Sequence, residues 1–124
     1  MSPTRPGRVL IVEDDEELSS LIVELLGADH IAAVAVESGL AAVAFLESQP
    51  LPSLILLDLG MPGMDGVEFR RRQLEHLAWS RIPVIVLSAD HAAGIKARAM
   101  GVEGFLTKPV NPRSLLTLIA RWTS

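Results

Sequence analysis

Short apolar runs alternate along the chain with stretches in which apolar residues recur at helical spacing. Three of the runs contain four consecutive apolar residues, a pattern typical of strands that are buried on both faces of a parallel sheet. Proline, glycine or acidic residues separate the two kinds of segment, as is usual for turns and helix ends. The pattern predicts strands at residues 9–12, 32–36, 54–57, 84–87 and 104–107, of which the second and the fifth are weaker.

The segments between these strands carry the helical pattern. Ser38 suits an N-cap because its hydroxyl can accept a backbone N–H, and Asn111 followed by Pro112 suits the start of the last helix. Gly101 suits the end of a short, alanine-rich helix over residues 92–100. The other helices are predicted from apolar faces made by Leu18, Leu21, Ile22 and Leu25; by Leu40, Val43 and Leu46; by Val67, Leu74, Leu77 and Ala78; and by Leu115, Leu118, Ile119 and Trp122.

Strand and helix alternate five times, which predicts right-handed βαβ crossovers and an α/β fold with a parallel sheet between two layers of helices. The chain has 124 residues, 49% of them hydrophobic, which is enough for one domain with a proper core. We expect that domain to span residues 8–122, after a flexible lead-in at residues 1–7 that contains two prolines and a glycine.

Charge and composition exclude several classes of protein. The formal net charge is -4, whereas a generic nucleic-acid binder carries a basic surface. The absence of cysteine excludes disulfides and thiol chemistry and fits the cytoplasm, where we expect the protein to be. No segment approaches the roughly 18 apolar residues of a membrane span, and the first residues lack the apolar stretch of a signal peptide.

Polar side chains follow four of the expected strands at the point where each strand ends. Glu13 and Asp14 follow the first strand, Asp58 the third, Ser88 the fourth and Lys108 the fifth. The carboxyl ends of parallel strands meet at one edge of a sheet, where ligands bind in open α/β folds. We therefore expect three carboxylates, a hydroxyl and an ammonium group around one crevice.

Three clustered carboxylates repel one another, and a bound cation would relieve that repulsion. Oxygen ligands with few protein contacts suit Mg²⁺, which also binds phosphate oxygens. Asp58 would then act as a nucleophile that accepts a phosphoryl group, with Lys108 offsetting the charge. Each residue alone has a simpler interpretation: Glu13 and Asp14 as helix N-terminal acids, Asp58 as a turn aspartate, Ser88 as an N-cap and Lys108 as a surface lysine. Their joint occurrence at successive strand ends, in this order, favours the phosphoacceptor.

The motifs that carry these residues resemble the receiver domain of two-component response regulators over about residues 8–122. The matching segments are Val12-Glu-Asp-Asp15, Leu57-Asp-Leu-Gly-Met-Pro-Gly-Met-Asp-Gly66, Leu87-Ser-Ala89 and Phe105-Leu-Thr-Lys-Pro109. The resemblance implies a flavodoxin-like (βα)₅ fold with a doubly wound, five-stranded parallel sheet in the order 2-1-3-4-5. It also implies a signalling domain that catalyses only its own phosphorylation and dephosphorylation.

The resemblance further implies a role for each site residue. Asp58 would take a phosphoryl group from a histidine, and Ser88 and Lys108 would bind the phosphoryl oxygens. Ser88 and Phe105 would form the switch, in which the aromatic ring fills the space that the hydroxyl residue leaves. The Lys108–Pro109 bond is expected to be cis. Mg²⁺ would be held by Glu13, Asp14, Asp58 and the backbone carbonyl of Gly60.

The expected partners are a histidine kinase or a histidine phosphotransfer domain and a downstream protein target. The switched surface would comprise residues 92–100, 104–107 and 112–122 and would control partner binding or a phosphorelay, in a monomer or in a homodimer that forms on phosphorylation. One alternative is a pseudo-receiver that binds proteins and never takes phosphate. A second alternative is a hydrolase with an aspartyl nucleophile, against which Gly60 argues because such phosphatases place a second acid there.

Three other features receive a structural interpretation. Arg70, Arg71 and Arg72 are expected to form a solvated helix face. Trp79 and Trp122 are expected to be packing residues. The three histidines show no metal-ligand spacing, and we expect His91, after Ser88, to lie at the surface.

Overall fold

The computed structural model describes residues 8–60, 66–90 and 92–123. The lead-in at residues 1–7, residues 61–65 of the loop after Asp58, and His91 lie outside the described residues. The flexible lead-in and the surface position of His91 therefore stay predictions. The elements are β1 (Val9–Val12), α1 (Glu16–Ala28), β2 (Ala33–Val36), α2 (Gly39–Ser48), β3 (Leu54–Asp58), α3 (Gly66–Glu75), a 3₁₀ turn η1 (Trp79–Arg81), β4 (Val84–Ser88), α4 (Ala93–Ala99), β5 (Gly104–Thr107) and α5 (Pro112–Thr123).

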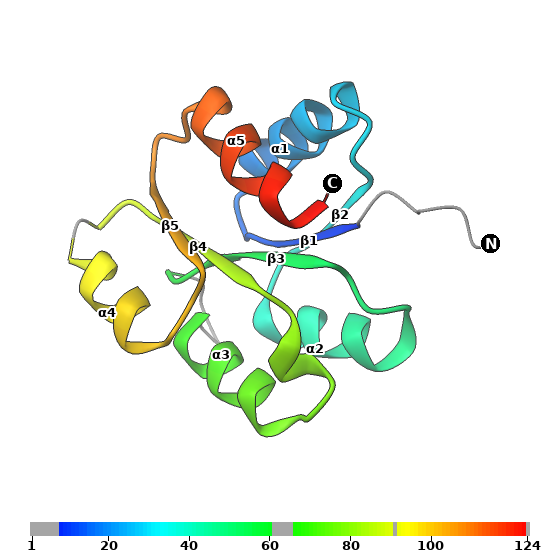
Figure 1. Ribbon diagram of the computed structural model, residues 1–124, viewed down its shortest axis with the longest axis vertical. Coiled ribbons are helices and arrows are strands. Elements are labelled where there is room, and N and C mark those ends of the chain that lie inside the picture. Colours follow the sequence, from blue (N-terminus) through cyan, green and yellow to red (C-terminus); the bar gives the residue numbers. More distant parts are fainter. Residues whose placement is uncertain (1–7, 61–65, 91, 124) are drawn as a thin grey trace.

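The five strands pair in parallel in the order β2-β1-β3-β4-β5, which confirms the predicted flavodoxin-like topology. Helices α1 and α5 cover one face of the sheet, and α2, α3 and α4 cover the other (Figure 1). The central strands β1, β3 and β4 are buried along their whole length, as their unbroken apolar runs predict. No helix in the described ranges is both long enough and apolar enough to cross a membrane.

Alternate residues of the strands build two separate cores. Each buried Leu, Ile or Val side chain stabilises the fold by about 1.5–3 kcal/mol relative to its exposed state. Val12, Leu57 and Val86 are among the strand residues that face α2, α3 and α4. The opposite core contains Ile11, Leu56, Leu87, Ile22, Leu26, Leu115 and Ile119, from the strands, α1 and α5.

The predicted helix ends agree with the structure. Ser38 Oγ accepts a hydrogen bond from the Ala41 N–H at the start of α2. Asn111 Oδ1 accepts one from the Ser114 N–H at the start of α5. After α4 the chain leaves the helix at Gly101, whose φ of 68° is a conformation that glycine adopts at little cost.

Several residues that the helical pattern assigns to the core face the solvent instead. Leu21, Leu40 and Leu77 are 50%, 63% and 78% exposed. The buried apolar residues of α1 are Ile22, as predicted, and Leu26, which lies one position after the predicted Leu25. The apolar face of each helix is wider than the area that packs against the sheet, so only part of that face is buried. The other predicted core residues that are exposed are Val67, Leu74, Ala78 and Trp122.

The prediction of a solvated arginine face is wrong for one of the three arginines. Arg71 and Arg72 are exposed, but Arg70 is only 6% exposed. Its Nε donates to the Met100 carbonyl at 3.1 Å and its Nη2 to the Gly101 carbonyl at 3.2 Å, at the C-terminal end of α4. Burial lowers the pKa of Arg70. The guanidinium nevertheless stays charged, and the negative C-terminal end of α4 stabilises that charge. Trp79 is buried as predicted.

Candidate functional site

The register of the sheet places the predicted site residues at one edge. Val12 pairs with Leu57, so Glu13 and Asp58 stand at the same level above neighbouring strands. Asp58 pairs with Leu87, and Ser88 pairs with Thr107, the residue before Lys108. The polar residues at the ends of β1, β3, β4 and β5 therefore lie at one edge of the sheet, as the alternation of strands and helices predicts.

The acids and the lysine meet at that edge. Carboxylate oxygens of Glu13, Asp14 and Asp58 lie within 4.8 Å of one another. Lys108 Nζ lies 2.8 Å from Glu13 Oε1 and 3.5 Å from Asp58 Oδ1. Glu13 and Asp58 are buried, whereas Asp14 is exposed and Lys108 is partly exposed. One rim of the cluster is therefore open to an incoming ligand.

Burial and mutual repulsion govern the charges of this cluster. Burial raises the pKa of Glu13, and the charge of Asp58 adds to that rise, while hydrogen bonds from Lys108 and the Asp15 N–H oppose it. Burial alone would lower the pKa of Lys108, but the hydrogen bond to Glu13 and the charges of Asp58 and Glu13 outweigh it, so the pKa rises. The lysine therefore stays protonated beside acids that repel one another.

The donor set fits a hard divalent cation. Glu13 Oε1 is fully buried, and Lys108 Nζ, at 2.8 Å, is its close polar neighbour among the described residues. Mg²⁺ and Mn²⁺ prefer carboxylate oxygens of this kind. Glu13, Asp14 and Asp58 are the residues that fit such an ion.

The chain around Asp58 is shaped by two glycines. The Gly60 N–H donates to Asp58 Oδ1 at 3.2 Å, and this glycine is exposed. Gly66 begins α3 directly behind the acid. A Cβ at Gly66 would lie 2.6 Å from the Asp58 carbonyl oxygen and 2.7 Å from Leu59 Cα, closer than real Cβ contacts. The close approach of α3 to the end of β3 therefore requires glycine at this position.

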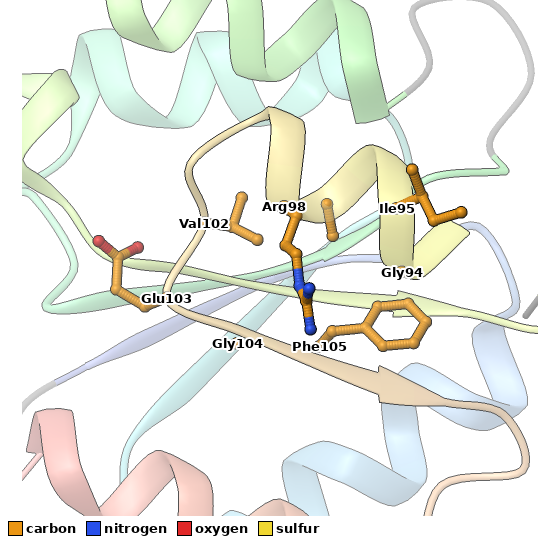
Figure 2. A pocket seen from close by; sticks show the side chains of 8 residues that line it. Gly94, Ile95, Arg98, Val102, Glu103, Gly104 and Phe105 are labelled. Carbon is orange, nitrogen blue, oxygen red and sulfur yellow. The ribbon is translucent and has the colours of Figure 1, made fainter. Parts of the chain in front are cut away.

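Ser88 and Phe105 lie on the neighbouring strands β4 and β5. Ser88 Oγ accepts a hydrogen bond from the Asp90 N–H at 3.1 Å, so its own proton remains available for another acceptor. Phe105 is half-buried, and its ring lies next to Gly94 of α4, with 3.6 Å between its Cε2 and a Cβ built on that glycine (Figure 2). The Lys108–Pro109 peptide bond is cis, as predicted.

Two residues contribute to the site although the sequence pattern predicts no role for them in it. Asp15 caps α1 through its Oδ1, and its N–H donates to Glu13 Oε2 at 3.1 Å, which orients that carboxylate. Gly66 admits α3 behind Asp58. Aspartate directly before a helix is a readable capping signal, but nothing local reveals how closely Gly66 approaches Asp58.

Comparisons with known proteins agree with this geometry. The family model of the response regulator receiver domain matches residues 9–120. The chain is 33% identical over 118 residues to the two-component response regulator ORR11 of Oryza sativa, covering 94% of this chain and 80% of that protein. It is 36% identical over 124 residues to response regulator Rcp1 of Synechocystis sp., covering 92% and 84% of the two chains.

A solved structure gives the same result. The crystal structure of the Mn²⁺-bound form of response regulator Rcp1 superimposes with a TM-score of 0.78 at 35% identity, covering 92% of this chain and 89% of that one. The family match spans most of the chain, and the strand order is the one that the family resemblance implied. The chain therefore belongs to the receiver domain family of two-component response regulators.

Proposed function

We propose that Asp58 is the phosphoacceptor of this receiver domain and that the domain spans residues 8–122. The observation that carries the proposal is the position of the Asp58 carboxylate. It stands at the carboxyl edge of the sheet, 3.5 Å from Lys108 Nζ and within 4.8 Å of two other carboxylates. An ordinary turn aspartate does not require two further carboxylates beside it, because their charges repel its own.

The transfer requires one bond to form and one to break. An Asp58 oxygen attacks the phosphorus of a phosphohistidine, the O–P bond forms, and the N–P bond breaks as the imidazole leaves with the electron pair and takes a proton from water. The Gly60 N–H and Lys108 both contact Oδ1. In the described part of the chain Oδ2 makes no such contact, and we assign the attack to it.

The neighbouring residues would stabilise the charge of the phosphoryl group. Glu13, Asp14, Asp58 and the Gly60 carbonyl would hold Mg²⁺, which when bound would neutralise charge on the phosphoryl oxygens. The Mn²⁺-bound form of the relative Rcp1 supports a divalent cation at this edge. Lys108 would balance the remaining charge, and the Ser88 hydroxyl would donate a hydrogen bond to a phosphoryl oxygen.

Phosphorylation would be read out through Ser88 and Phe105. Once Ser88 turns toward the phosphoryl group it gives up the hydrogen bond from Asp90, and Phe105, beside α4, can shift into the space released. The change would alter the surface formed by α4, β5 and α5. A histidine kinase or a histidine phosphotransfer domain would supply the phosphoryl group in the cytoplasm, and a downstream protein would bind the altered surface.

The test is adduct formation on the purified chain. Incubation with Mg²⁺ and a small phosphodonor is expected to add one phosphoryl group by intact mass, and chelation of Mg²⁺ is expected to prevent it. Asp58→Asn should form no adduct, whereas the matched control Asp90→Asn, an exposed acid near the site, should still form one. An unmodified wild-type chain, or an adduct that persists in Asp58→Asn, would contradict the proposal and would favour the pseudo-receiver alternative.

A further inference from the structure

The outer strand β2 leaves one edge of the sheet without a strand partner among the described residues. β2 stands first in the order β2-β1-β3-β4-β5 and pairs with β1 alone. The carbonyls of Ala32 and Val36 accept backbone N–H groups of β1, and in a parallel pair the direction of these groups alternates from residue to residue. The N–H and C=O groups of Ala33 and Ala35 therefore point away from the sheet, where a further strand could pair with them.

β2 also lacks the features that protect an edge strand in most proteins. Its sequence, Ala-Val-Ala-Val, contains no charged residue and no proline. It pairs with β1 in a regular register over all four residues, so no bulge turns the edge away from solvent. An unprotected edge of this kind is a template on which an extended segment of another chain can add a strand.

A groove of about 520 Å³ opens at the carboxyl end of this edge. Ser19 and Ser20 of α1 line one side and Ala41 of α2 lines the other, with Ala35 and Val36 of β2 between them. Because α1 and α2 pack on opposite faces of the sheet, the groove crosses the sheet edge (Figure 1). Ala35, whose backbone points outward, therefore belongs to a hollow of the size that proteins use to hold ligands.

The charged side chains that line the groove are all acidic among the residues that the structure describes: Glu13, Asp14, Glu16 and Glu37. The bias extends along the chain, because residues 9–69 contain 12 Asp or Glu and no Lys or Arg. Glu13 and Asp14 belong to the proposed metal site, which leaves Glu16 and Glu37 for a partner. Both are exposed, and neither side chain forms an ion pair with any described residue.

The cations of neighbouring elements do not line this groove. Lys108 is held by two carboxylates of the phosphoacceptor edge. Arg8, which precedes β1, donates to the Pro50 carbonyl. Arg113 and Arg121 of α5 are exposed and lie outside the groove lining. The negative charge of the groove is therefore complementary to a basic ligand from outside.

We propose that an extended, basic segment of a partner protein adds a strand to the edge of β2 and places a Lys or Arg side chain in the groove. Ala33 and Ala35 provide the backbone hydrogen bonds, and Glu16 and Glu37 pair with the basic side chain. Leu40, at the start of α2 and 63% exposed, offers an apolar contact beside it. The inference goes beyond the proposed function, because β2 and β5 are opposite edges of the sheet and binding at β2 does not require phosphorylation.

Two other occupants fit less well. A second copy that pairs edge to edge about a two-fold axis would bring two acidic segments together, and residues 9–69 contain no cation to compensate. A nucleic acid would be repelled by the same carboxylates. A basic strand satisfies both the charge of the groove and the open backbone groups of β2.

The first experiment measures peptide binding to the full chain by fluorescence anisotropy. The probe is a short fluorescein-labelled peptide of Val and Thr with central lysines, and its matched control carries glutamate in place of every lysine. Two further lysine peptides are N-methylated at alternate residues, one in each register. We expect the lysine peptide to bind and the glutamate peptide not to bind. One N-methylated peptide should bind at least about tenfold more weakly, because it loses hydrogen bonds to β2, and the other should bind like the parent.

Variants of β2 and of the groove locate the binding site. Ala35→Pro removes an outward N–H and no hydrogen bond to β1, so the sheet should form while the lysine peptide binds at least about tenfold more weakly. Ala35→Ser keeps this N–H and should bind normally. Glu37→Lys should weaken binding by about threefold to tenfold, and the control Glu47→Lys, which reverses an exposed acid of α2 outside the groove, should not.

Circular dichroism shows whether each variant is folded, and the N-methylated peptides keep the test decisive if Ala35→Pro is not. Equal binding of the glutamate peptide, equal binding of both N-methylated peptides and their parent, or no effect of Glu37→Lys would each overturn the inference. Self-association that Ala35→Pro abolishes in sedimentation velocity would also overturn it, by assigning the edge to a second copy. Adduct formation on Asp58 tests the phosphoacceptor separately, because the lysine peptide is expected to bind the unphosphorylated, metal-free chain.

Discussion

Replacing Gln73 by leucine removes the polar centre of the buried contact between α3 and the rest of the domain. Gln73 is fully buried, and its side chain makes three hydrogen bonds. Nε2 donates to the Trp79 carbonyl at 2.8 Å and to the Ile82 carbonyl at 3.0 Å, and Oε1 accepts from Arg70 Nη1 at 2.7 Å. Leucine has a similar volume, so the substitution tests the hydrogen bonds with little cavity formation.

The magnitude follows from those three bonds. Each neutral bond to a backbone carbonyl contributes about 1 kcal/mol, and the bond from the charged guanidinium contributes about 1.5–3 kcal/mol. The Trp79 carbonyl keeps a hydrogen bond from the Ile82 N–H and Arg70 keeps two others, but all three bonds to Gln73 are lost in a buried place. We therefore expect Gln73→Leu to lower the free energy of unfolding by about 3.5–5 kcal/mol. That loss is a large fraction of the 5–15 kcal/mol that is typical of a folded domain.

Urea denaturation followed by circular dichroism measures this change. The transition midpoint should fall with little change in slope, and the melting temperature should fall by at least about 10 °C. Arg72→Leu on the same helix is the matched control, because Arg72 is exposed, and it should shift the free energy of unfolding by less than about 0.5 kcal/mol. A loss below about 1 kcal/mol for Gln73→Leu would show that the buried network contributes little and would refute the reasoning.

Three further predictions concern the site. Gly66→Ala should destabilise the domain by about 1–3 kcal/mol in urea and slow phosphorylation, because its Cβ would meet backbone atoms of Asp58 and Leu59, whereas Gly27→Ala, with no atom within 4 Å, should be neutral or stabilising. Mg²⁺ at 100 times its Kd should raise the free energy of unfolding by about 2.7 kcal/mol, and Asp58→Asn should remove most of that gain; an equal gain in the variant would contradict the assigned ligand set. The raised pKa of Glu13 means that, in the metal-free chain, the folded state binds more protons than the unfolded state at pH values between 4.5 and that raised pKa. Its contribution to stability should therefore increase as the pH falls through this window, and Mn²⁺ affinity measured by calorimetry should decrease; Glu13→Gln should lose both trends, and a pH trend that survives in this variant would assign it to another group.

Much of the fold is encoded in short-range signals. The unbroken runs at β1, β3 and β4 predict buried strands, and the N-caps Ser38 and Asn111 and the helix end at Gly101 all lie where the sequence places them. These features depend on contacts within a few residues, so residue type and spacing suffice to predict them. The gathering of Glu13, Asp58 and Lys108 was also predictable, because parallel strands of similar length end at one edge.

The face that α3 turns inward was not predictable in this way. Of its apolar side chains Phe69 is buried but Val67 and Leu74 are exposed, while the polar Arg70 and Gln73 are buried. These two polar side chains find their partners at the end of α4 and around η1, up to 31 residues away along the chain.

Features that the sequence predicts differ from those it does not predict for one physical reason. Propensity, capping and hydrophobic period act between neighbours and are written directly in the order of residues. The cost of burying Arg70, and the distances that make Glu13, Lys108 and Asp58 a single electrostatic unit, depend on which distant carbonyls and charges packing brings within reach.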